Sequence, residues 1–156
     1  MVTSRALGVD VGRRRIGLAI SDPTGTLARP LTTITVDSDI AGGVDQVARQ
    51  VIRLAAEDDG LCVVVVGVPS SLDGTPTEQT REVTVFMDAL RGRITVPVIG
   101  EDERLTSREA EERLALREPD WRKRKLRLDA AAAAIMLQDF LDRSVKPANH
   151  DRGEEY

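Results

Sequence analysis

The sequence has little of the chemistry that cysteine and histidine supply. It contains one cysteine, Cys62, and one histidine, His150. A single cysteine cannot form an internal disulfide, which fits a reducing compartment, and its place inside LCVVVVG predicts a small core residue. The histidine lies in the polar C-terminal tail, where we expect no role for it. Zinc sites and Ser–His catalysis are therefore not serious candidates.

Long apolar runs are also missing. No window approaches the ~18 consecutive apolar residues of a membrane span, and the N-terminus MVTSRALGVD lacks the apolar stretch of a secretory signal. We therefore expect a cytoplasmic protein with no membrane partner. Its 156 residues, 41% of them hydrophobic, predict one compact domain over 1–143 and a polar, disordered tail over 144–156.

Local patterns predict three antiparallel strands followed by alternating helices and strands. Apolar runs predict strands at 5–11, 15–21, 28–36, 62–69 and 94–100. Helical spacing and capping residues predict helices from Val44 to about Asp58, from a capping box at Thr75 and Glu78, and over roughly 106–116 and 128–142, with a mobile basic loop at 117–127. This order predicts an α/β protein with a mixed five-stranded sheet, three antiparallel strands then two parallel, flanked by helices: the ribonuclease H-like fold.

Three carboxylates stand where such a sheet could bring them to one side. Asp10 lies in the apolar first strand, Glu103 just beyond the fifth, and Asp129 in the first turn of the last helix. Two divalent ions about 4 Å apart can activate a water, hold a phosphoryl group and neutralise its leaving oxygen. Oxygen ligands suit Mg²⁺ or Mn²⁺. The pattern predicts a metal-dependent phosphodiester hydrolase in which these three residues bind the metal and are catalytic.

Each carboxylate also has a structural interpretation. Asp10 could be a buried acid paired with an arginine such as Arg15. Asp129 could compensate the dipole at a helix N-terminus. Glu103 follows Glu101 and Asp102, so the spacing alone does not choose which of the three faces the site.

Five blocks of the chain, in order, resemble the signature blocks of the YqgF (RuvX) family. They are LGVDVGRRRIGLAISD, GTLARPLTTI, VVVVGVPSSLDGT, DERLTSREAEERL and KLRLDAAAAAIMLQDFLD, spread over residues 5–142. The resemblance implies a ribonuclease H-like fold related to the Holliday junction resolvase RuvC. It implies a nuclease role in maturing the 5′ end of the 16S ribosomal RNA precursor, or, as the alternative, resolution of four-way DNA junctions in recombination and repair.

The three candidate ligands match the family's acids: Asp10 in the first strand, Glu103 in the DER block with Asp102 as its substitute, and Asp129 at the opening of the last helix. Two positions depart from the family pattern. Ser71 stands where many relatives have Asn, so the side-chain amide is lost there. Ala132 stands where RuvC-type sites carry a second acid, which leaves three carboxylates and weakens a second metal position.

The net charge of −4 argues against a general polyanion binder, so nucleic-acid contacts need basic residues that are concentrated locally. Two clusters supply them: Arg13, Arg14 and Arg15 in the first hairpin, and Arg122, Lys123, Arg124, Lys125 and Arg127 before the last helix. Both would flank the carboxylates, and phosphate contacts position a nucleic acid without reading its sequence. Arg104 is a candidate for the scissile phosphate, and Trp121 for stacking on an unpaired base.

Two other classes of protein compete with a nuclease. DVGRRRIGLAISD also resembles the phosphate-binding hairpin of actin-like ATPases and sugar kinases, but the chain has length for only one of their two lobes. A catalytically silent RNA-binding or assembly factor is the other class, and the three acids argue against it. Because the core needs all the apolar helical stripes, we expect a monomer or weak homodimer that binds structured RNA or branched DNA.

Overall fold

The computed structural model describes residues 4–36, 40–103 and 121–150. One five-stranded sheet with the strand order β3-β2-β1-β4-β5 organises them. The strands are β1 (Arg5–Val11), β2 (Arg15–Ser21), β3 (Ala28–Thr35), β4 (Leu61–Val68) and β5 (Val98–Asp102). β2 pairs antiparallel with β1 and β3, whereas β4 pairs parallel with β1 and β5. The predicted mixed sheet of three antiparallel and two parallel strands is confirmed.

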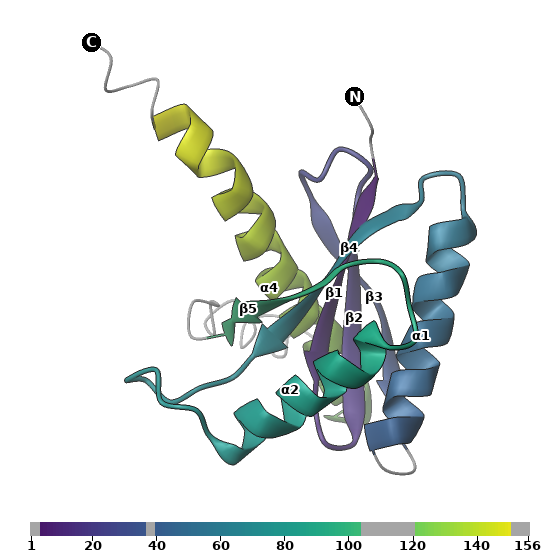
Figure 1. Cartoon of the computed structure of the whole chain (residues 1–156), viewed down its shortest axis with the longest axis vertical. Helices are drawn as coiled ribbons and strands as arrows, with labels where there is room; N and C mark the ends of the chain where they lie inside the picture. The colour runs from purple at the N-terminus through teal and green to yellow at the C-terminus, as the bar shows by residue number, and fades with distance from the viewer. Residues whose placement is uncertain (1–3, 37–39, 104–120, 151–156) are drawn as a thin grey trace.

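Helices cover both faces of this sheet (Figure 1). They are α1 (Ile40–Ala56), α2 (Glu78–Arg91) and α4 (Trp121–His150). α1 and α2 contact each other and β4, whereas α4 lies across β1, β2 and β3. Two separate apolar clusters result: one includes Leu7, Val9 and Phe86, and the other joins the sheet to Leu137 of α4. The protein is therefore a three-layer α/β structure.

α4 approaches the sheet closely because the facing residues are small. Ala6 and Ala19 of the sheet belong to the same apolar cluster as Ala133 of α4. A Cβ added at Gly8 would lie 2.9 Å from the Cβ of Leu137. Side chains alternate between the two faces of a strand, so the residue two positions after Gly8 also faces α4. That residue is Asp10.

The N-terminal cap of α2 lies two residues after the predicted one. Thr77 is the N-cap: its side chain accepts a hydrogen bond from the Thr80 N–H at 3.3 Å, and the Thr80 hydroxyl accepts one from the Thr77 N–H at 2.9 Å. Thr75 instead closes the preceding loop, where its N–H donates to Asp73 at 2.9 Å. The prediction of a capping box at Thr75 and Glu78 was wrong because this loop already uses the backbone of Thr75.

Two predictions about the parallel strands were wrong in detail. β5 starts at Val98, four residues later than predicted, and the preceding residue, Pro97, has no N–H for a ladder. Its carbonyl still accepts from the Val64 N–H at 2.9 Å. Cys62 is exposed and not in the core: it lies between buried Leu61 and half-buried Val63, and the continuous buried run of the strand starts only at Val64. Its thiol donates a weak hydrogen bond to the carbonyl of Arg5 at 3.3 Å.

α4 is longer at both ends than the predicted helix over 128–142. It starts at Trp121, so the part of the expected basic loop at 121–127 is helical, and it continues to His150. Arg, Lys and Leu dominate WRKRKLR, and all three favour helix. The helix predicted at 106–116 lies outside the described residues. Over the described ranges, no helix combines the length and apolar character that crossing a membrane requires.

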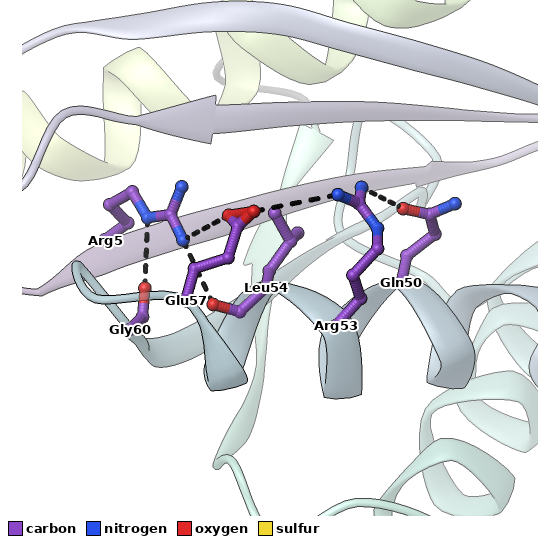
Figure 2. A network of polar contacts seen from close by, with 6 residues as sticks. All are labelled: Arg5, Gln50, Arg53, Leu54, Glu57 and Gly60. Carbon is purple, nitrogen blue, oxygen red and sulfur yellow. Dashed lines mark hydrogen bonds and ion pairs between the residues drawn. The ribbon is translucent and has the colours of Figure 1, made fainter.

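A polar network around Arg5 ties the start of β1 to the end of α1 (Figure 2). The guanidinium donates to the carbonyl of Gly60 at 3.1 Å and to that of Leu54 at 3.0 Å, and it pairs with Glu57 at 3.0 Å. Arg53 reaches the same carboxylate from α1 at 3.7 Å. Cations near a helix C-terminus satisfy its last carbonyls. The network anchors the amino end of β1, and Asp10 lies toward the opposite end.

Candidate active site

The carboxyl ends of β1, β4 and β5 form one edge of the sheet, because these three strands run parallel. Such edges are where α/β sheets commonly bind ligands. Asp10 is the penultimate residue of β1, and Glu103 directly follows β5. The two carboxyl groups share a hydrogen bond. Two acids that are 93 positions apart in sequence thus meet at this edge.

The pKa of Asp10 is raised well above its ordinary value of 3.8. Burial is the largest cause, followed by the hydrogen bond and the negative charge of Glu103, and then by the charge of Asp129. Two carboxyls in contact cannot both ionise cheaply unless a cation compensates them. In the absence of a cation, Asp10 is therefore harder to ionise than an ordinary aspartate.

Two glycines make room for this arrangement. Gly67 of β4 lies two positions after Val65, whose side chain packs in the cluster beneath α4. A Cβ at Gly67 would lie 2.5 Å from Oε1 of Glu103. Gly17 of β2 pairs directly with Asp10, and a Cβ there would collide with the backbone carbonyl of Asp129. Any other residue would push these two acids away from Asp10.

Asp129 reaches the site from α4, but not as the sequence predicted. It lies eight residues after the first residue of α4, so it does not compensate the dipole of the helix N-terminus. Its Oδ2 accepts a hydrogen bond from Nε of Arg15 at 2.7 Å. Arg15, the example of an arginine that could pair with a purely structural Asp10, pairs with Asp129 in the structure. Asp129 remains near enough to Asp10 for its charge to raise that pKa.

The donors at this edge are carboxylate oxygens, which suit a hard divalent ion such as Mg²⁺ or Mn²⁺. The Asp10–Glu103 pair fits such an ion, because a positive charge between the two carboxylates would offset their repulsion. Within the part of the chain that the structure describes, no three His, Cys, Asp or Glu side chains are gathered as a ready metal site. Oδ2 of Asp129 is paired with Arg15, so a cation that uses Asp129 meets the positive charge of the guanidinium.

The structure describes the positions of some of the residues that were predicted to contact nucleic acid. Arg13 and Arg14 are exposed in the turn between β1 and β2, which the Gly12 N–H closes by donating to the Arg15 carbonyl at 2.9 Å. Arg13 also lies 4.0 Å from Glu82 of α2. The backbone of Arg122, Lys123, Arg124 and Lys125 lies in the first turns of α4. Their side chains, and all of Arg104, lie outside the described residues.

Sequence reasoning missed the roles of Gly17, Gly67 and Arg15. The signal for the glycines was present, because an isolated glycine inside an apolar strand often marks a close approach of another backbone or side chain. The signal for Arg15 was ambiguous, because it is one of three consecutive arginines. Only the position of α4 distinguishes it from Arg13 and Arg14.

Metal-free protein is expected to lose stability as the pH rises above the ordinary aspartate value, because Asp10 holds its proton more tightly in the folded than in the unfolded state. Its pKa is raised in the folded state, so its contribution is fully present below the unfolded value of 3.8 and is lost as the pH passes the folded value. Urea denaturation in chelator, on wild type and on Asp10→Asn, measures this contribution as the difference between the two profiles. Hydrogen bonds in their turns lower the pKa values of Asp22 and Asp73. The pH dependence that these two residues add to stability therefore lies at lower pH.

Parallel pH profiles for wild type and Asp10→Asn would contradict this assignment of the Asp10 pKa. A wild-type profile that falls relative to the variant as the pH rises would support it.

The order and pairing of the strands place the protein in the ribonuclease H-like fold class. Thermus thermophilus RuvC shares this fold with a TM-score of 0.54 and 15% identity, covering 91% of this chain and 96% of that one. RuvC from T. thermophilus in complex with a Holliday junction substrate has a TM-score of 0.52 and 18% identity, covering 88% and 93%. At these identities the likeness assigns the fold, and it agrees with the predicted ribonuclease H-like fold.

Sequence relatives identify the family. A protein of Roseiflexus sp. strain RS-1 is 40% identical over 138 residues, which are 88% of this chain and 94% of the relative. One from Chloroflexus aggregans is 43% identical over 141 residues, or 90% and 95%. Both are named as candidate pre-16S rRNA nucleases. The family model RuvX, described as Holliday junction resolvase, matches residues 4–143, and the chain belongs to this family.

Proposed function

We propose that this protein is a divalent-metal-dependent nuclease that processes the 5′ end of the 16S ribosomal RNA precursor in the cytoplasm. The observation that carries the proposal is the contact between the carboxyls of Asp10 and Glu103 at the carboxyl edge of the sheet, within reach of the charge of Asp129. Family membership supports hydrolysis of phosphodiester bonds, and the names of the relatives support the RNA substrate.

Each candidate site residue has a proposed role in this reaction. Asp10 and Glu103 would hold the ion, and Asp129 would complete its ligands. When bound, Mg²⁺ or Mn²⁺ would supply a water of lowered pKa and a positive charge opposite the leaving oxygen. Arg13 and Arg14, exposed at the hairpin, would hold the phosphate backbone. Arg104, Arg122, Lys123, Arg124 and Lys125 are proposed to extend that basic surface.

The alternative function is Holliday junction resolution. The description of the family and the junction bound by T. thermophilus RuvC favour it. Resolving a four-way junction requires two symmetric nicks, and hence a two-fold dimer with paired sites. A nuclease that acts on the end of a precursor RNA needs no such symmetry and can work as a monomer. We favour RNA processing by a monomer or weak dimer.

The test compares the two substrates directly. Purified protein is incubated with a 16S precursor RNA and, separately, with a synthetic four-way DNA junction, with Mg²⁺ or with chelator. We expect cleavage near the 5′ end of the mature RNA that requires Mg²⁺, and a monomeric mass by light scattering. Symmetric nicking of the junction by a stable dimer, with the RNA intact, would select the alternative. Absence of cleavage of both substrates would contradict a nuclease.

A further inference from the structure

Arg15 forms an ion pair with Asp129, one of the proposed metal ligands. Its Nε lies 2.7 Å from Oδ2 of Asp129, and the two side chains are only 32% and 30% exposed. The pair joins residues 114 positions apart, so it links the hairpin to α4. The backbone carbonyl of Arg15 closes that hairpin by accepting from the Gly12 N–H at 2.9 Å. The hairpin thereby fixes the backbone position from which the Arg15 side chain extends.

The backbone of Asp129 is also held in place. Its carbonyl packs directly against Gly17, the residue that pairs with Asp10 in the sheet. The backbone therefore has no room to move closer to the sheet. The side chain of Asp129 can still change partner by rotation, because it is partly exposed. Its charge acts on Asp10, so Asp129 lies within electrostatic reach of that acid.

We propose that Arg15 is a positioning residue that serves as the internal counter-cation of Asp129 and competes with the divalent ion for this carboxylate. The proposal rests on the metal site proposed above. With no ion bound, the guanidinium neutralises one of three neighbouring acids and holds Asp129 at the site. Arg15 holds Oδ2 of Asp129, so an ion that uses both oxygens must displace the guanidinium, and an ion on Oδ1 alone is repelled by its positive charge. Arg15 therefore lowers the metal affinity of a site that its neighbouring acids would otherwise make tighter.

Calorimetric titration of the purified full chain with Mn²⁺ alone measures this competition. A partly exposed ion pair contributes up to about 1 kcal/mol, equivalent to a factor of roughly five in a binding constant. We expect Arg15→Gln to bind Mn²⁺ about fivefold more tightly than wild type. Arg13→Gln removes the same charge from the same hairpin, but Arg13 lies beside Glu82 and not beside Asp129. It should therefore change the affinity much less.

A double-mutant cycle with Asp129→Asn isolates the pair from the general effect of charge. When Asp129→Asn is already present, Arg15→Gln should change the affinity no more than Arg13→Gln does. Arg15→Lys keeps the charge without the planar guanidinium, and its affinity should fall between wild type and Arg15→Gln. Circular dichroism checks that each variant is folded. If Arg15→Gln does not fold, the Mn²⁺ affinity of Arg15→Lys is compared with that of wild type instead.

The possible outcomes separate this proposal from the proposed function. Binding of Mn²⁺ by wild type but not by Asp10→Asn would support the metal site. If, in that case, Arg15→Gln binds Mn²⁺ no more tightly than wild type, the competition by Arg15 is overturned and the metal site stands. Equal gains for Arg15→Gln and Arg13→Gln would also overturn it. If wild type does not bind Mn²⁺, the metal site and the role of Arg15 both fail.

Discussion

Asp10→Asn and Glu103→Gln are each expected to lower cleavage of nucleic acid by at least about a hundredfold. Metal ions contribute several kcal/mol to stabilising the transition state, and each ~1.4 kcal/mol is a factor of ten in rate. The variants should still fold and bind nucleic acid, because each removes a charge from acids that repel one another. Initial rates in Mg²⁺, with binding measured separately, test the expectation.

Thermal stability provides a second measurement on the same variants. Mg²⁺ at a few times its dissociation constant should stabilise wild type by roughly 1 kcal/mol, and Asp10→Asn should lose this gain. Asp88→Asn is the matched control, since Asp88 is an exposed acid of α2 that pairs with Arg91, one helical turn away. It should cleave and bind metal as wild type does. Wild-type rates for both site variants would refute the assigned site.

Gly17→Ala is expected to destabilise the protein by about 2 kcal/mol or more and to reduce cleavage strongly. A Cβ at this position would overlap the carbonyl of Asp129, and a backbone carbonyl cannot rotate away as a side chain can. Overpacking a buried contact costs about 1–3 kcal/mol. Relief requires α4 to move away from β2, which also takes Asp129 away from Asp10. Urea denaturation and cleavage rates measure the two effects.

Gly92→Ala is the control for this glycine. Gly92 follows α2 with a φ of −73°, and the nearest atom to an added Cβ would lie 3.5 Å away, an ordinary contact. Its substitution should leave stability and cleavage near wild type, or add a few tenths of a kcal/mol by restricting the unfolded chain. Equal stability of Gly17→Ala and Gly92→Ala would show that α4 does not depend on Gly17.

The sequence by itself determined the elements whose signals are local. The predicted ranges of β1 and β2 match the structure, because short apolar runs bounded by glycine and charge specify strands without reference to the rest of the chain. The element order then predicted the mixed sheet. Asp10 could be selected because an acid inside an apolar strand is costly unless it has a use.

The tertiary structure alone decided which side chains meet. It placed Glu103 against Asp10, and it paired Arg15 with Asp129 and not with Asp10. These contacts depend on strand register and on how closely α4 packs against glycine, and both are set by many residues acting together. A partner 114 positions away leaves no periodic trace in the sequence, so one arginine among three could be assigned only from the fold.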